Sequence, residues 1–94
     1  MSEPRQIRLK RLAMRSMRRG IREMDLILQD FSQREMAGLS AGELDDFEAL
    51  LAENDHDLYA WVSGSGAPPE RFAALVARLS QGARGLTRPG RDSP

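Results

Sequence analysis

The sequence predicts an all-α protein, a compact bundle of about five short helices, and three observations support this prediction. Apolar residues recur three or four positions apart through most of the chain, which is the period of an amphipathic helix. No segment shows the alternation of apolar and polar residues that is typical of a strand. The 94 residues suffice for one small domain with a single modest core.

The first helical region covers residues 5–35, and its apolar positions fall on one side of a helix. They are Leu9, Leu12, Ala13, Met17, Ile21, Met24, Leu28 and Phe31. Such a length is unusual for one helix of a small domain, so we expect a break near Gly20. Glycine often follows the last residue of a helix in the left-handed conformation, and Gly20 is therefore the expected C′ residue.

The next two helices are predicted from their caps. In "SAGE", Ser40 stands at the N-cap and Glu43 three residues later, which is the pattern of a capping box. Either Asn54 or Asp55 can begin the following short helix. The expected apolar positions of the two helices are Leu44, Phe47, Leu50 and Leu51, and then Leu58, Tyr59, Trp61 and Val62.

The last helix is expected after the turn-forming stretch "SGSGAPP" at 63–69. Its prolines suit the first turn of a helix, where the missing N–H is harmless. Its apolar positions are Phe72, Leu75, Val76 and Leu79. From Gly82 onward little remains to be buried, so we predict a helical domain over 5–82 and a disordered tail over 83–94.

Charge is unevenly distributed although the net charge is zero. Residues 1–22 hold eight basic residues and one acid, and residues 23–57 hold eleven acids and one arginine. At helical spacing, one stripe forms from Arg8, Arg11, Arg15, Arg18 and Arg22. Three interpretations are open: a phosphate-binding surface, a solvated face paired with the acidic middle helices, or a face that docks on an acidic protein.

Catalytic and metal-binding chemistry find little support in this composition. The chain has no cysteine, so disulfides and thiolate metal sites are excluded and a reducing compartment is its natural home. Its one histidine, His56, lies among capping residues and is expected to be exposed. We predict no catalytic residue, no metal site and no insertion into a membrane, because no apolar run approaches the roughly 20 residues that a span needs. The basic N-terminus is interpreted as part of the domain and not as a leader.

Arg19, Gly20 and Glu23 lie in the most unusual stretch of the chain, where a glycine interrupts a run that otherwise looks helical. On a helix, residues four apart lie on the same side, so Arg19 and Glu23 would flank the space left by the glycine. They would form a flat patch with donors at one end and an acceptor at the other, which a partner's backbone could approach. From these residues alone, a C-terminal cap with incidental charges is an equally good interpretation.

Residues Arg19 to Glu23 match the RGxxE signature of the succinate dehydrogenase flavinylation factors, the SdhE-type assembly proteins. The longer stretch "RRGIREMDLIL" resembles the same part of that family, and "LSAGELDDFEALLAENDHDLYAWVSG" resembles its second block. The two blocks occur in the family's order and cover roughly residues 8–64. The chain departs from the family at His56, where many relatives have proline, and this affects the start of the fourth helix.

The resemblance implies a five-helix domain that binds the flavoprotein subunit of succinate dehydrogenase, and in bacteria that of the related fumarate reductase. Such a factor promotes covalent attachment of FAD to its partner in a chaperone-like way. It would need no catalytic site and would hold no FAD as its own cofactor. A bacterial chain of this kind is expected in the cytoplasm, as a monomer when free, without a nucleic-acid partner.

Carried over by position, the resemblance places Arg19, Gly20 and Glu23 at the contact with the flavoprotein. It adds Arg11, Arg15, Arg18 and Asp25 as neighbours of that contact. The alternative function is a small nucleic-acid-binding regulator that uses the arginine stripe, and it predicts an affinity that falls steeply with salt. A toxin–antitoxin or other generic interaction module is a third, weaker alternative.

Overall fold

The computed structural model describes residues 3–87, with side chains as far as residue 84. Within this range the chain forms five α-helices and two 3₁₀ turns and no strand, which confirms the predicted all-α bundle. In chain order the elements are α1 (Arg5–Arg15), α2 (Arg22–Arg34), η1 (Met36–Gly38), α3 (Ala41–Leu51), α4 (Asp55–Ser63), η2 (Glu70–Phe72) and α5 (Ala73–Thr87).

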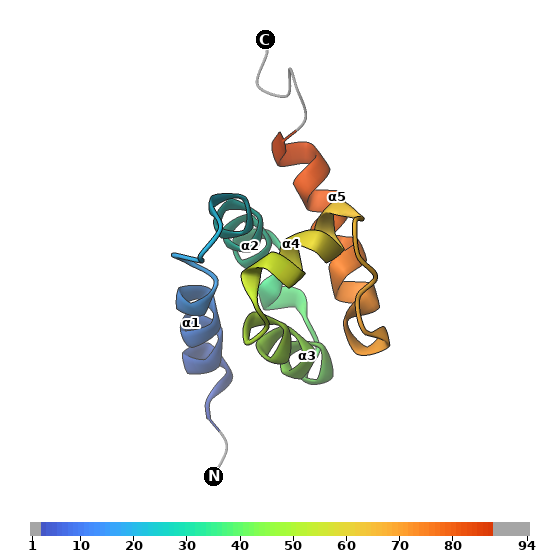
Figure 1. Ribbon diagram of the computed structural model, residues 1–94. Helices are drawn as coiled ribbons and strands as arrows, with labels where there is room; N and C mark the ends of the chain where they lie inside the picture. The colour runs from blue at the N-terminus through green and yellow to red at the C-terminus, as the bar shows by residue number, and fades with distance from the viewer. Residues whose placement is uncertain (1–2, 88–94) are drawn as a thin grey trace.

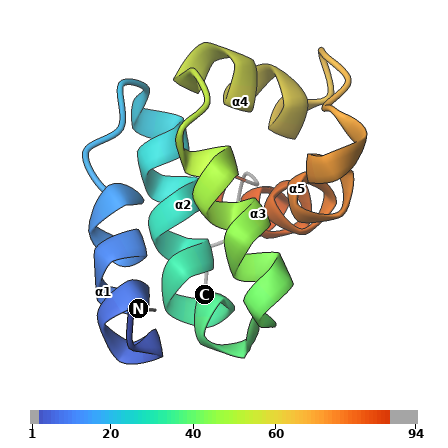
Figure 2. The same ribbon diagram turned by 90° about the horizontal axis from the view of Figure 1, so that it is seen from below.

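Helix α2 is the centre of the bundle, because it packs against α1, α4 and α5. Figure 1 shows α1 beside α2 at one edge of the molecule and α5 at the other. In Figure 2, α4 runs across the ends of α2 and α3. This arrangement brings the beginning of α4 close to the connection between α1 and α2.

The core is formed by apolar residues of all five helices, and most of them are positions that the sequence predicted. The predicted positions of α3 and of the last helix are all buried, as are Leu58 and Val62 of α4. The rings of Phe31 and Phe47 lie 5.3 Å apart and join α2 to α3. Two of the predicted apolar positions are not in the core: Met17 lies outside the helices and is 44% exposed, and Tyr59 of α4 is 39% exposed.

Both predicted caps are present, and each is made by a polar side chain next to its own helix. Ser40 Oγ accepts from the backbone N–H of Glu43 at 3.1 Å, and the Glu43 carboxylate accepts from the N–H of Ser40 at 2.8 Å. This confirms the capping box. Of the two candidates for the start of α4, Asn54 is the cap, since its side chain accepts from the N–H of His56 at 2.8 Å.

The break between α1 and α2 is confirmed, but the role predicted for Gly20 in it is wrong. Helix α1 already ends at Arg15, and the buried Ser16 that follows donates to the carbonyl of Leu12 at 2.8 Å. The left-handed residue of the connection is Arg18, with φ of 56°, and Gly20 has no positive φ. The preference for glycine after the last residue of a helix therefore did not predict where α1 ends.

The predicted end of the domain at residue 82 is also wrong. Helix α5 continues to Thr87, and Ala83 is 9% exposed and belongs to the core. Residues 83–87 are thus helical and not a disordered tail. The rest of the predicted tail, 88–94, lies outside the described residues. No helix in the described range is long and apolar enough to cross a membrane.

Candidate functional site

The RGxxE residues lie at the junction of α1 and α2, where residues 16–21 form a connection that we call the α1–α2 loop (Figure 1). Arg19 and Gly20 belong to this loop, and Glu23 lies in the first turn of α2. The expectation that Arg19 and Glu23 share a helical turn is therefore wrong, since α2 begins only at Arg22.

Asp55, the first residue of α4, binds the α1–α2 loop with both of its carboxylate oxygens. Its Oδ1 accepts from Nε of Arg19 at 2.8 Å, and its Oδ2 accepts from the backbone N–H of Gly20 at 2.7 Å. An acid at a helix N-terminus is also favoured by the helix dipole. The sequence suggested Asp55 only as a possible cap. No local pattern distinguishes a carboxylate that caps its own helix from one that binds a loop 35 residues away.

The guanidinium of Arg19 faces the interior of the molecule. Besides the bond to Asp55, its Nη1 donates to the carbonyl of Arg15 at 3.0 Å and its Nη2 to the carbonyl of Glu53 at 3.4 Å. Only 12% of the Arg19 side chain is exposed. Arg19 thus joins the end of α1 to the segment that precedes α4.

A different physical reason now explains the glycine at position 20. A β-carbon added there would lie 3.0 Å from Oδ2 of Asp55, closer than side chains normally pack. The residue itself lies at the surface. Glycine at this position therefore lets the Asp55 carboxylate reach the backbone, and this reason was not among the two that the sequence left open.

A second carboxylate, that of Asp25, binds the α1–α2 loop at Arg18. Its Oδ1 accepts from the backbone N–H of Arg18 at 2.7 Å and from Nε2 of Gln29 at 2.8 Å. The Gln29 side chain, followed by the backbone donors of the loop, lowers the pKa of Asp25 below its ordinary value of 3.8. The bond that the Arg18 N–H donates to Asp25 supports the left-handed conformation of Arg18.

The solvent-facing side of this junction has exposed apolar side chains and a carboxylate that makes no bond within the described residues. Met14 is 73% and Met17 44% exposed, and with Arg18 they line a shallow hollow of about 200 Å³. Glu23 is exposed and accepts no hydrogen bond or ion pair from any residue between 3 and 84. Exposed methionines adapt to many partner shapes, so this surface suits protein recognition.

The predicted arginine stripe does not form one continuous helical face. Arg18 lies in the α1–α2 loop and Arg22 is the first residue of α2, so only Arg8, Arg11 and Arg15 share a helix. The continuity of the stripe was inferred from a helix that the loop interrupts. That part of the prediction is wrong.

The arginines that remain on α1 are paired with the acidic helix α3. Arg8 binds Asp45 at 2.7 Å and Glu48 at 3.2 Å, Arg11 binds Glu48 at 2.9 Å, and Arg15 lies 3.8 Å from Glu48. The hydrogen bond from Arg11 is the main reason why the pKa of Glu48 lies below its ordinary value. Of the three interpretations of the stripe, internal pairing is confirmed for these residues.

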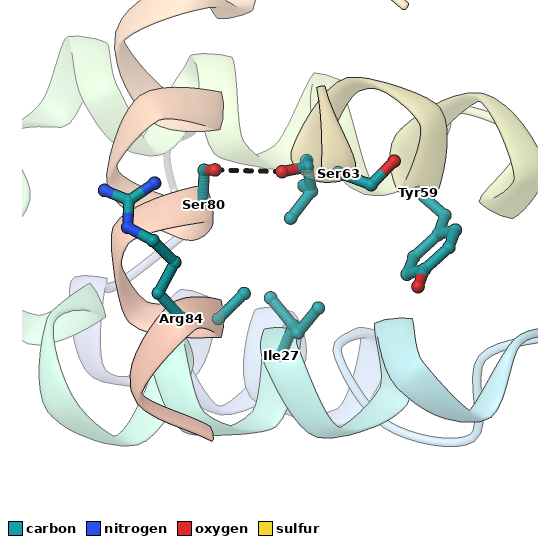
Figure 3. A pocket seen from close by; sticks show the side chains of 7 residues that line it. Ile27, Tyr59, Ser63, Ser80 and Arg84 are labelled. Atoms are coloured by element: carbon teal, nitrogen blue, oxygen red, sulfur yellow. Dashed lines mark hydrogen bonds between the residues drawn. The ribbon is translucent and has the colours of Figure 1, made fainter. Parts of the chain in front are cut away.

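A second hollow, of about 260 Å³, lies between α2, α4 and α5 (Figure 3). Polar and apolar side chains line it together, and Ser80 donates to the carbonyl of Val62 at 2.9 Å. Its lining consists of Ile27, Tyr59, Val62, Ser63, Ser80, Ala83 and Arg84. Within residues 3–87, no group of histidine and acidic side chains is arranged to hold a metal ion, and His56 is exposed as expected.

Comparison with known proteins gives consistent matches. The family model described as "Flavinator of succinate dehydrogenase" matches residues 10–83. A FAD assembly factor SdhE from Vibrio cholerae is 45% identical over 63 residues, which cover 66% of this chain and 73% of that protein. The FAD assembly factor SdhE of Legionella pneumophila (strain Lens) is 40% identical over 60 residues, covering 64% of this chain and 76% of that protein.

A mitochondrial relative extends the match to eukaryotes. The succinate dehydrogenase assembly factor 2 of Mycosarcoma maydis is 38% identical over 72 residues, or 77% of this chain. The match spans only 30% of that fungal protein. Because the family model covers most of the described helices, including the α1–α2 loop and Asp55, the chain belongs to the family of succinate dehydrogenase flavinators.

Proposed function

We propose that this protein is an assembly factor that binds the flavoprotein subunit of succinate dehydrogenase and promotes the covalent attachment of FAD to it. The family match over residues 10–83 carries this proposal. Its relatives in bacteria and in mitochondria are both named assembly factors, one for FAD and one for succinate dehydrogenase. The flavoprotein of fumarate reductase is a second partner in this proposal.

The proposed contact is centred on the α1–α2 loop. Arg19, Gly20 and Glu23 define it, and Glu23 is the residue best placed for a direct bond because no described residue occupies its carboxylate. The neighbours Arg18 and Asp25 belong to the same loop structure. Arg11 and Arg15 flank it from α1, where both are also paired with Glu48.

In this proposal the protein acts as a binding partner and contributes no catalytic group of its own. FAD is then attached to a residue of the flavoprotein, and the assembly factor stabilises a conformation in which attachment is favourable. The exposed methionines and the ordered loop support a role in protein recognition. The free protein is proposed to be a monomer in the bacterial cytoplasm.

The alternative of a nucleic-acid-binding regulator is less well supported. Phosphate binding requires cations that are available to exchange their counterions. Arg8 and Arg11 instead donate to Glu48 of α3, and the stripe is interrupted before Arg18.

Co-expression tests the proposed function directly. The flavoprotein subunit is produced with and without this chain, and covalent flavin is measured by fluorescence in a denaturing gel. We expect clearly stronger fluorescence when the chain is present. Equal fluorescence in the two samples would refute the proposal.

The contact is tested by pull-down of the flavoprotein with Gly20→Arg and Glu23→Ala. Both variants are expected to lose binding while their circular dichroism stays helical. A matched control is Asp46→Asn, which removes an ion pair of 2.6 Å to Arg71 on another part of the molecule. If both site variants bind like the control, the contact lies elsewhere.

A further inference from the structure

We propose that Asp55 is a positioning residue for flavoprotein docking, and that Arg19 and Gly20 act through it and not by touching the partner. This inference rests on the proposed function. It changes the role of the first two RGxxE residues from direct contact to internal support. It leaves Glu23 as the direct contact of the motif.

The hydrogen bonds of Arg19 are the first argument. Each of the three guanidinium nitrogens donates to an internal acceptor: Asp55, the carbonyl of Arg15 or the carbonyl of Glu53. With 12% of the side chain exposed, little of it can meet a partner. The Asp55 carboxylate that accepts one of these bonds is itself only 20% exposed.

The backbone of Gly20 is the second argument. Its N–H is used by Asp55 at 2.7 Å, and a side chain at this position would press on the same carboxylate. A partner's backbone therefore does not find a free donor at Gly20. Because Gly20 has no side chain, the Asp55 carboxylate can reach the Gly20 N–H from inside the molecule.

Ordering of the loop is the consequence for binding. One carboxylate fixes two consecutive residues, and Asp25 fixes Arg18 next to them. A loop that is ordered before docking loses less conformational entropy when it docks, which strengthens affinity. If loss of Asp55 leaves the loop in its docking conformation a tenth of the time, the apparent affinity falls roughly tenfold.

Amide hydrogen exchange of the free protein tests the internal part of the inference. In ¹⁵N-labelled protein, we expect the Gly20 amide to exchange roughly tenfold faster in Asp55→Asn than in the native protein, because a bond to a carboxylate is lost. The Gly20 resonance should also move. Unchanged exchange and an unchanged resonance would overturn the proposal whether or not a flavoprotein binds.

A double-mutant cycle on flavoprotein affinity tests the positioning role. Asp55→Ala and Arg19→Ala are each expected to weaken binding roughly tenfold, and the double variant no further, because both remove the same support. Glu23→Ala should instead add its own loss to that of Asp55→Ala. If the double variant lost affinity by the product of the two single losses, Arg19 and Asp55 would act independently and Arg19 would touch the partner. Full affinity of Asp55→Ala would lead to the same conclusion. Either result would overturn the proposal.

Stability and charge are controlled in the same experiment. Gly64→Ala strains the opposite end of α4, and Asp46→Asn removes an ion pair as short as those of the loop, so neither should change affinity. If Gly64→Ala weakens binding as much as Asp55→Ala does, the effect is general destabilisation and the positioning role is refuted. Failure of the native protein to bind any flavoprotein would refute the proposed function, while the amide measurement still decides whether Asp55 orders the loop.

Discussion

Each end of α4 lies next to a turn, and the two turns are stabilised by different kinds of contact. At its C-terminus, Gly64 has φ of 89°, and the N–H groups of Gly64 and Ser65 donate to the carbonyls of Trp61 and Ala60. At its N-terminus, Asp55 orders the α1–α2 loop, whose residues are 35 and 36 positions away. The first turn is held by its own backbone, whereas the second depends on a distant carboxylate.

This difference shows that a glycine has more than one structural use. Gly64 is needed for its backbone conformation, because other residues rarely adopt a positive φ. Gly20 needs no such conformation and instead leaves room for Asp55. Substitutions at the two turns should therefore have different consequences, and four measurements test this.

The largest effect is expected for Asp55→Ala. It leaves the largely buried guanidinium of Arg19 and the N–H of Gly20 without the acceptor that they share, which should lower the free energy of unfolding by about 2 kcal/mol. Urea denaturation followed by circular dichroism measures this change. A loss no larger than that of Asp46→Asn would mean that the loop does not depend on Asp55.

Gly64→Ala is expected to come next, with a loss of about 1–2 kcal/mol from a left-handed backbone that carries a side chain. The same denaturation experiment applies. Gly42→Ala is the matched control, since Gly42 lies in α3 without a positive φ and with open space around it. That control should be neutral or slightly stabilising, and equal losses at both positions would contradict the explanation given for Gly64.

Gly20→Ala should cost less stability than Gly64→Ala, under about 1 kcal/mol, because its φ is not positive and the Asp55 side chain can shift. It should nevertheless change the amide resonances of the loop, as seen in a ¹H–¹⁵N spectrum. Gly64→Ala should leave those loop resonances in place. The reverse pattern would invalidate the comparison between the two turns.

The smallest effect is expected from pH. The pKa of Asp25 is lowered in the folded protein, so its stabilising contribution is present above its ordinary value of 3.8 and is lost as the pH falls through the folded value. The Arg18 amide should therefore lose protection from exchange only as the pH falls below 3.8, where the folded Asp25 carboxylate becomes protonated. The Ser65 amide donates to a backbone carbonyl and serves as the internal reference. Equal loss of protection at both amides would indicate general acid unfolding.

The elements that could be predicted from sequence are those whose determinants are close together in the chain. Ser40 and Glu43 form a capping box three residues apart, and Asn54 caps the helix that follows it. The apolar stripes of α3 and α5 repeat with the helical period, so their buried faces followed from spacing. The family resemblance rested on such local blocks and was confirmed by the match over residues 10–83.

By itself, then, the sequence determined the all-α class, the caps, most of the core and the family. Only the tertiary structure decided that α1 ends at Arg15, that α5 extends to Thr87, and that Arg19 turns inward. The inward turn of Arg19 depends on contacts with Glu53 and Asp55, which are distant in the chain, and local spacing carries no information on which distant groups will meet. In the α1–α2 loop, the backbone N–H groups of Arg18 and Gly20 donate to the side chains of Asp25 and Asp55, and Asp55 belongs to a helix more than 30 residues further along the chain.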